Sequence, residues 1–286
     1  MSGMDEPQPV AAHEATAPSA RRRGSLPLSG LAGWRRTLRY ILARFFATVL
    51  MRLLFDIRVE GRERFASEPA IYCFSHLGWT DPLILLAALP LRPRLFFFGP
   101  KEEDMSRGGA NRLMSWTGTS LPFKPGKGDL LETTRRVQAV FDSGAVLAIA
   151  GEGRIHVSES EITPLQEGTA YFALRSRVPI IPVTINGNSW LAFRRRIRVQ
   201  LGEPIAPEGR PSRETVEVLT VRVWTALRAM VADAPDIPAT TGLFGWLTEL
   251  FNDWGDGTPE ALERARQRRE AQVPGAGRGG GAAAGR

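Results

Sequence analysis

His76 and Asp81 are the residues of this chain whose types and spacing suit acid–base chemistry. His76 directly follows an apolar run at 70–75, and Asp81 stands five residues later, where an apolar helix is expected to begin. A carboxylate there can accept one ring N–H of the imidazole, which fixes the tautomer and leaves the other nitrogen free to take a proton from a hydroxyl. The alternative interpretation is that Asp81 only caps the helix and His76 is only a loop residue.

The other histidines and the cysteine are weaker candidates for chemistry. His13 lies in a segment expected to be disordered, and His156 lies in a polar loop. Cys73 is the single cysteine and falls inside the run 70–75, where a small buried thiol is usual. One cysteine excludes an internal disulfide and favours a reducing compartment. No group of His, Cys and carboxylate residues has the spacing of a metal site, so no metal is expected.

Short apolar runs and helical patterns alternate along the chain, and they must position these residues. The runs that predict strands are 57–60, 70–75, 94–98, 145–150, 180–185 and 197–201. The patterns that predict helices begin at Asp81, read as the N-cap ahead of Pro82, and continue at 104–116, 129–141, 212–230 and 243–254. Strands that alternate with helices predict an α/β fold, here as a single layered domain.

Composition divides the 286 residues into a core region and two tails. Residues 1–30 and 258–286 are rich in small, polar and charged residues, so both are expected to be disordered, and residues 57–257 form the folded domain. Apolar residues make up 43% of the chain, enough for a sizeable core. The formal net charge of +7 favours anionic partners, either a phospholipid surface or nucleic acid.

Residues 31–56 predict an amphipathic helix that associates with a membrane. An apolar stripe recurs every three or four residues, and Arg36 and Arg44 fall away from it; the stripe is Leu31, Trp34, Leu38, Leu42, Phe45, Val49 and Leu53. Nearby arginines favour an anionic leaflet, where each adds about 1 kcal/mol. Burial in the core is the alternative. For the helix at 243–254 the two interpretations stand equal.

A membrane span is not expected anywhere in the chain. The best candidate, residues 40–55, is interrupted by Arg44 and Arg52, and each charge at mid-span costs roughly 2.5–3.5 kcal/mol. The first 30 residues also hold no apolar run long enough for a secretory signal. We therefore expect a peripheral protein at the cytoplasmic face of the membrane.

Four blocks in order resemble the glycerolipid and lysophospholipid acyltransferase family, which includes the 1-acyl-glycerol-3-phosphate acyltransferases. Residues 76–81 are similar to its His-x4-Asp motif. The second, third and fourth blocks correspond to Gly-Thr-Ser-Leu-Pro-Phe-Lys at 118–124, Ala-Gly-Glu-Gly-Arg at 150–154 and Val-Pro-Ile-Ile-Pro-Val at 178–183. The resemblance covers about 57–186. It implies a mixed, mostly parallel sheet flanked by helices, with an acyltransferase domain at 57–257.

The resemblance also implies the reaction. His76, oriented by Asp81, would deprotonate the hydroxyl of a lysophospholipid, which would attack the thioester of acyl-CoA or an acyl carrier protein. With 1-acyl-glycerol-3-phosphate (lysophosphatidic acid) as acceptor, the product is phosphatidate, a step of phospholipid biosynthesis. A thioester is already activated, so the reaction needs a base and an oxyanion stabiliser but neither a cofactor nor an acyl-Cys73 intermediate.

The chain departs from the family pattern where the family holds the phosphate of its acceptor. The resemblance assigns substrate binding to Lys124, Glu152, Gly153 and Arg154, but Lys124 replaces an arginine and Ile155 stands where a second arginine is usual. A guanidinium grips phosphate with two hydrogen bonds, whereas an ammonium acts as a point charge. The departure leaves open another lysolipid acceptor, such as an amino-acid lipid or a glycolipid.

Two alternatives give Glu152 and the whole chain other roles. Glu152 can pair with Arg154 or cap a loop, in which case it is structural. The chain as a whole can be a non-enzymatic basic protein that binds membrane or nucleic acid, although it contains no nucleic-acid motif and no nucleic-acid partner is expected.

Overall fold

The computed structural model describes residues 33–101, 116–123 and 130–252. In chain order its elements are α1 (Gly33–Leu54), β1 (Asp56–Glu60), the 3-10 helix η1 (Arg62–Arg64), β2 (Ile71–Phe74), α2 (Asp81–Ala88), β3 (Leu95–Lys101), β4 (Ser120–Phe123), α5 (Leu130–Asp142), β5 (Val146–Ala150), α6 (Gly168–Ser176), β6 (Ile180–Asn186), β7 (Arg196–Leu201), α7 (Arg213–Val231) and α8 (Gly242–Phe251). The tails expected at 1–30 and 258–286, and nearly all of the helix expected at 104–116, lie outside the described residues.

The described strands form one sheet in the order β1-β7-β6-β2-β5-β3-β4. β6 and β7 pair antiparallel, and every other neighbouring pair is parallel. Every residue of β2 and β6 is buried, as expected for central strands with both faces covered. The prediction of an α/β fold with a mixed, mostly parallel sheet flanked by helices is therefore confirmed.

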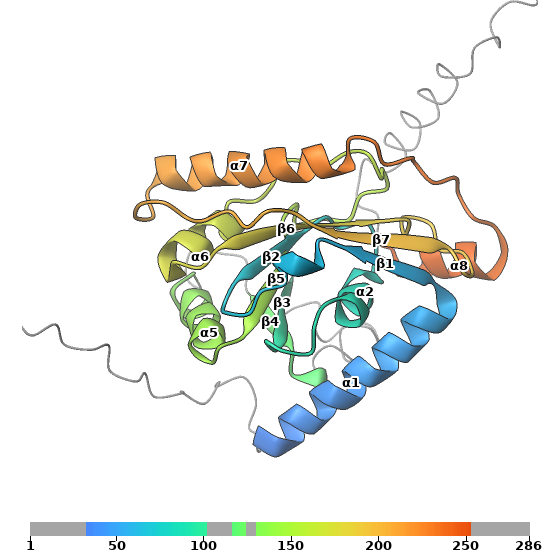
Figure 1. The fold of residues 1–286 in the computed structure, drawn as a ribbon, viewed down its shortest axis with the longest axis horizontal. Coiled ribbons are helices and arrows are strands. Elements are labelled where there is room, and N and C mark those ends of the chain that lie inside the picture. Colours follow the sequence, from blue (N-terminus) through green and yellow to red (C-terminus); the bar gives the residue numbers. More distant parts are fainter. Residues whose placement is uncertain (1–32, 102–115, 124–129, 253–286) are drawn as a thin grey trace, which may run out of the picture.

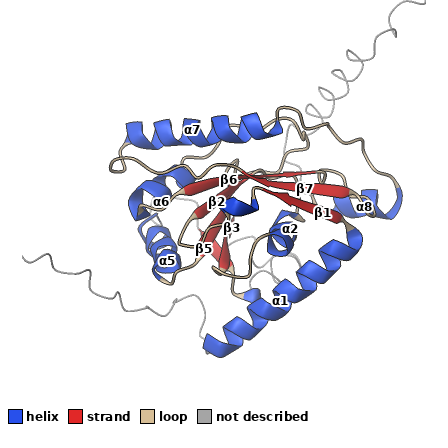
Figure 2. Cartoon of the chain, in the orientation of Figure 1, coloured by secondary structure: helices blue, strands red, loops and turns tan. Residues whose placement is uncertain are grey.

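Helices cover both faces of the sheet. α5, α6 and α7 lie on one side, and α1 and α2 lie on the other (Figure 1). Each side has its own apolar cluster: Phe55, Tyr72 and Leu85 belong to the one under α1 and α2, whereas Cys73 and Phe172 belong to the one under α5, α6 and α7. Figure 2 shows the strands in the middle of the molecule with helices around them.

β4 and α6 are elements that the sequence patterns do not predict. β4 has the sequence Ser-Leu-Pro-Phe and lies at the edge of the sheet, where the missing N–H of proline is tolerated. α6 has nine residues, starts with glycine and has no side-chain N-cap hydrogen bond. Both lack the end signals on which sequence patterns depend.

α1 presents two different faces. Tyr40, Arg44, Ala47 and Met51 are buried, and the Arg44 guanidinium donates hydrogen bonds to the carbonyl of Leu89 and the hydroxyl of Tyr40. The face that carries the expected apolar stripe is exposed; its large side chains are Trp34, Leu38, Ile41, Leu42, Phe45, Phe46, Val49, Leu50 and Leu53. The prediction that Arg44 falls away from the stripe is correct, and packing against the body buries it.

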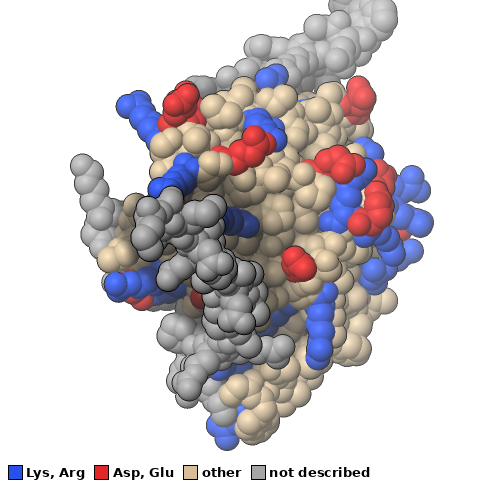
Figure 3. All heavy atoms as spheres, turned by 60° about the vertical axis from the view of Figure 1, so that its left-hand side comes forward, with Lys and Arg blue, Asp and Glu red and all other residues tan. Residues whose placement is uncertain are grey.

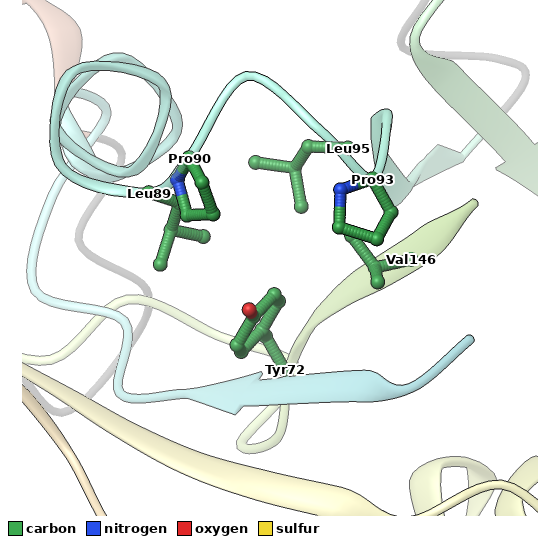
Figure 4. Close-up of a pocket in the computed structure, with 6 residues that line it drawn as sticks. All are labelled: Tyr72, Leu89, Pro90, Pro93, Leu95 and Val146. Carbon is green, nitrogen blue, oxygen red and sulfur yellow. The ribbon is translucent and has the colours of Figure 1, made fainter. Parts of the chain in front are cut away.

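A small apolar pocket lies between the sheet and the segment after α2. Figure 4 shows the side chain of Tyr72 directed from β2 toward Pro90 and Pro93. The pocket also contacts Leu95 and Val146, which are the first residues of β3 and β5. It has no space for a water molecule, and it lies toward the amino ends of these strands. We therefore interpret it as a gap in the packing of the core and not as a binding site.

Candidate active site

Three neighbouring parallel strands, β6, β2 and β5, end at the same edge of the sheet. His76 follows β2, Glu152 follows β5 and Asn188 follows β6. In open α/β sheets the carboxyl ends of parallel strands are where ligands bind. The strand order therefore gathers these three side chains, which are 36 or more residues apart in the sequence, at one place.

His76 and Asp81 meet as their spacing predicts. The imidazole Nδ1 of His76 lies 2.7 Å from Oδ2 of Asp81. The Asp81 side chain is 0% exposed and that of His76 is 21% exposed, so the ring reaches solvent while its partner does not. A buried carboxylate that accepts Nδ1–H leaves Nε2 with its lone pair, which is the form of histidine that removes a proton.

Asp81 holds the loop before it. Its Oδ2 also accepts hydrogen bonds from the backbone N–H groups of Leu77, at 2.9 Å, and Gly78, at 3.1 Å. Its Oδ1 accepts a hydrogen bond from the side-chain amide of Asn188. The expected N-cap role of Asp81 needs correction: Thr80 is the N-cap, and Asp81 is the first helical residue. Its carboxylate turns back to the loop and the imidazole because those donors occupy it.

Glu152 is buried and engaged by protein groups. Its Oε1 accepts from the backbone N of His76 at 3.2 Å and lies 3.0 Å from Nε2 of His156, and its Oε2 accepts from N and Oγ1 of Thr163. Burial raises the pKa of Glu152, but the hydrogen bonds from His156 and Thr163 outweigh it and hold the pKa below its usual value.

This arrangement favours the structural alternative for Glu152. Its side chain is 0% exposed and both oxygens accept hydrogen bonds from protein groups, one of them from the loop that carries His76. The other partners are His156 and Thr163, whereas the sequence analysis offers Arg154. Its expected role in substrate binding stays a prediction.

Gly153 and Arg154 lie in the turn after β5. Gly153 has a φ of 69°, a conformation that favours glycine, and its N–H donates to the carbonyl of Ala150 at 3.1 Å. That donor is used within the turn and is not available to a ligand. Arg154 is exposed. In the sequence it lies between Glu152 and His156, and both residues hydrogen-bond to the main chain of His76. Glu152 accepts from the His76 N–H, and the N–H of His156 donates to the His76 carbonyl at 3.0 Å.

Residues 56–186 match the family model described as Acyltransferase. This segment is 131 of the 286 residues, and over it the chain is similar to the acyltransferase family. The match includes the His76–Asp81 pair and the turn at 150–154, so the motifs that resemble this family lie inside the matched segment.

Two known proteins are similar to the chain. A 1-acyl-sn-glycerol-3-phosphate acyltransferase of Saccharomyces cerevisiae is 25% identical over 167 residues, which are 57% of this chain and 54% of that protein. The chain thus spans about half the length of this curated relative. The crystal structure of the 1-acyl-sn-glycerophosphate (LPA) acyltransferase PlsC from Thermotoga maritima has the same fold, with a TM-score of 0.53, 18% identity, and coverage of 68% of this chain and 80% of that one.

Two further groups of residues bear on the candidate site. Lys124, the other expected phosphate ligand, lies outside the described residues. Three contributors are not predicted from the sequence: His156 on Glu152, Asn188 on Asp81, and Asn252, whose Oδ1 accepts from the N–H of Trp79 at 2.9 Å. A signal for Asn188 exists, because polar residues directly after a buried strand are candidates for the site edge. Asn252 has none.

Cys73 is a buried thiol inside a strand, as the sequence analysis expects. It is fully buried in β2, and burial raises the pKa of its thiol to about 12. Because the thiolate is the reactive form, we expect an alkylating reagent to leave the folded protein unmodified at pH 8, and Cys73→Ala to keep wild-type turnover. Mass spectrometry and an acyl-transfer assay check this; rapid labelling with loss of turnover would instead support an acyl-cysteine intermediate.

Proposed function

We propose that this protein transfers a fatty acyl group from a thioester, acyl-CoA or acyl carrier protein, to the hydroxyl of 1-acyl-glycerol-3-phosphate, giving phosphatidate. The observation that carries the proposal is the His76–Asp81 pair, with a buried carboxylate on Nδ1 and a ring that reaches solvent at the edge of the sheet. The match of residues 56–186 to the acyltransferase family model and the activity for which the Saccharomyces cerevisiae relative is named support the reaction class.

The pair accounts for each proton in this reaction. The acceptor hydroxyl gives its proton to Nε2 of His76 while its oxygen attacks the thioester carbonyl carbon, and Asp81 stabilises the imidazolium that forms. The tetrahedral intermediate then collapses: the carbon–sulfur bond breaks, and the leaving thiolate takes the proton from Nε2. An ester and a free thiol are formed, and His76 returns to its neutral form.

Arg154 is the described residue best placed to bind the acceptor phosphate. It is exposed, its neighbours Glu152 and His156 bond the main chain of His76, and its side chain makes no hydrogen bond or ion pair with any other described residue. A guanidinium makes charge-assisted hydrogen bonds to phosphate, so a cation here would orient the acceptor hydroxyl toward the base.

Replacement of Arg154 tests the acceptor. We expect Arg154→Ala to raise the KM for lysophosphatidate and lower kcat/KM by up to ~100-fold, the cost of a lost charge-assisted contact, with little change in the KM for acyl-CoA. Arg154→Lys should recover part of the loss in kcat/KM, since lysine keeps the positive charge but cannot make the paired hydrogen bonds of a guanidinium. Steady-state kinetics with each substrate varied in turn measures both effects, and Arg213→Ala, an exposed arginine on α7, is the matched control.

A panel of lysolipids separates the proposed acceptor from its alternatives. If an amino-acid lipid or a glycolipid is the acceptor, it will be acylated faster than lysophosphatidate, and Arg154→Ala will leave the acceptor kinetics nearly unchanged. That pair of results would keep the acyl transfer and reject the phosphatidate product.

We further propose that α1 lies in a membrane interface at the cytoplasmic face, with its exposed apolar side in the lipid. Among the described residues, no helix is both long enough and apolar enough to cross a bilayer. The helix has 22 residues and is therefore about 33 Å long, and nine large apolar side chains stand exposed along it. An apolar face of that length beside basic residues is typical of an interfacial helix.

The alternative of a non-enzymatic basic protein finds less support. On the face shown in Figure 3, acidic side chains lie among the basic ones. On β1 and β7, Arg58 and Arg196 pair with Asp56, and Arg198 pairs with Glu60 at 2.6 Å. A surface for nucleic acid needs a continuous field of one sign, which these pairs interrupt.

A further inference from the structure

We propose that Asn188 and Asn252 are positioning residues that hold the loop 76–81 from two sides, Asn188 by donating to Asp81 and Asn252 by accepting from the loop backbone. The inference rests on the proposed function, because it assigns the two amides to the geometry of the base His76. Neither asparagine belongs to the sequence blocks of the family, and both come from segments distant from the loop along the chain.

Asn188 completes the set of donors around the Asp81 carboxylate. Its Nδ2 donates to Oδ1, on the side opposite to the oxygen that serves His76, Leu77 and Gly78. Because the partner is a carboxylate, only the amide N–H₂ can face it. Asn188 therefore fixes the second oxygen, so that the carboxylate cannot rotate and move the first away from the imidazole.

A buried carboxylate holds Asn188 in place. Glu159 accepts hydrogen bonds from the N–H groups of Gly187, at 2.9 Å, and Ser189, at 3.0 Å, the residues on either side of Asn188. Its own N–H donates to Oδ1 of Asp236 at 2.9 Å. The turn that presents Asn188 is thus tied to the segment 157–160 and to the connection after α7, which makes its position rigid.

Asn252 reaches the loop from the end of α8. Its Oδ1 accepts from the N–H of Trp79 at 2.9 Å, and a Cβ at Gly78 would lie 3.2 Å from the same oxygen. α8 is fixed beside it by Thr248, whose Oγ1 accepts from the N–H of Leu191 at 3.1 Å. A C-terminal helix therefore becomes part of the active-site framework, and the small size of Gly78 lets the amide approach.

The two amides use different atoms, Asn188 its nitrogen and Asn252 its oxygen, so one substitution can distinguish their roles. Asn188 serves as a donor to a carboxylate, whereas Asn252 serves as an acceptor from a backbone N–H. An aspartate keeps an acceptor oxygen but has no donor when ionised. The same substitution, asparagine to aspartate, should therefore preserve one contact and destroy the other, in side chains of nearly equal size.

The titratable groups around the dyad bear on the expected pH response. Among the described residues, Glu152 and His156 face it from the segment after β5, and Glu159 lies behind Asn188. Asn188→Asp puts a second carboxyl beside Asp81. The two groups share a proton at low pH, and once both are ionised the added negative charge favours the protonated imidazole. Because the base works only when neutral, the acid limb of the kcat/KM profile should move to higher pH, by about one unit or more.

The experiment measures acyl transfer by the full-length protein with lysophosphatidate in vesicles and acyl-CoA, for four variants. We expect Asn188→Asp and Asn188→Ala to lower kcat by about 10- to 100-fold, the cost of a misplaced catalytic group. Asn252→Ala should lower kcat by a similar factor without moving the acid limb of the kcat/KM profile. Asn252→Asp should keep kcat within about threefold of wild type, because its side chain still carries an acceptor oxygen. KM for acyl-CoA should change little in each variant.

Titration of His76 by NMR gives a readout that does not depend on turnover, with the resonance assigned by its loss in His76→Ala. The midpoint should rise in Asn188→Asp and stay in place in Asn252→Ala. If wild-type protein acylates no lysolipid while these midpoints behave as expected, the proposed function fails and the positioning role stands. Wild-type kcat in folded Asn188→Asp, Asn188→Ala and Asn252→Ala proteins, with an unmoved acid limb and midpoint in Asn188→Asp, would overturn the inference.

Discussion

Replacing His76 by alanine is expected to lower turnover by about 10²- to 10⁴-fold, the usual loss when a general base is removed. The protein should remain folded, because the ring is partly exposed and, within the described parts of the chain, its side chain hydrogen-bonds to Asp81 alone. The initial rate of acyl transfer at saturating acceptor and donor measures the effect, and circular dichroism with thermal unfolding verifies the fold. A folded His76→Ala protein with wild-type turnover would falsify the base assignment.

His156 provides the matched control for this substitution. It is a second histidine that pairs with a carboxylate, Glu152, yet its side chain is only 9% exposed. His156→Ala removes a partner from a buried carboxylate, so it should lower thermal stability and affect turnover less than His76→Ala does. Equal losses in both variants, at equal folded fractions, would show that the whole segment and not one base limits the reaction.

Making the exposed face of α1 polar is expected to reduce vesicle binding by at least about 100-fold, since each buried Leu, Val or Phe contributes about 1.5–3 kcal/mol of transfer free energy. The variant is Leu42→Ser with Phe45→Ser and Val49→Ser, three positions on the face that carries the apolar stripe. Sedimentation with vesicles that contain anionic phospholipid measures the bound fraction. These side chains are exposed, so unfolding of the protein should be little changed.

The control for α1 is the outer face of α7. Val218 and Val221 are also exposed apolar residues on a helix, and the double substitution to serine should leave vesicle binding unchanged. High salt should weaken wild-type binding in part, because screening affects the arginines near α1 but not its apolar contacts. Full-length protein that stays wholly in the supernatant at low salt would reject the interfacial position of α1.

Local sequence patterns determined most of the secondary structure and the central pair of the site. Six of the strands and the helices α1, α2, α5, α7 and α8 follow from runs whose apolar period is set within a few neighbouring residues. His76 and Asp81 are five residues apart on either side of one loop, so their contact depends on little beyond the strand before it and the helix after it. That is why the motif could be read without the fold.

Sequence patterns do not determine the role of a residue where that role depends on whether the fold buries its side chain. Glu152 belongs to a motif associated with ligand binding, but the fold places His156 and Thr163 against its two oxygens and removes it from solvent. For α1, periodicity indicates an apolar stripe but cannot say which face the body covers. Tyr40 and Met51, off the stripe, make the contact, so the stripe is left exposed.

Only the tertiary structure decided which residues support the loop of His76. Asn188 meets Asp81 across 107 positions of sequence, and Asn252 meets Trp79 across 173. Such contacts arise from the strand order β6-β2-β5 and from the docking of α8, neither of which has a local signal. Local propensity acts over a few residues, whereas these hydrogen bonds form only after the apolar faces of distant elements are buried together, and that packing is a property of the whole chain.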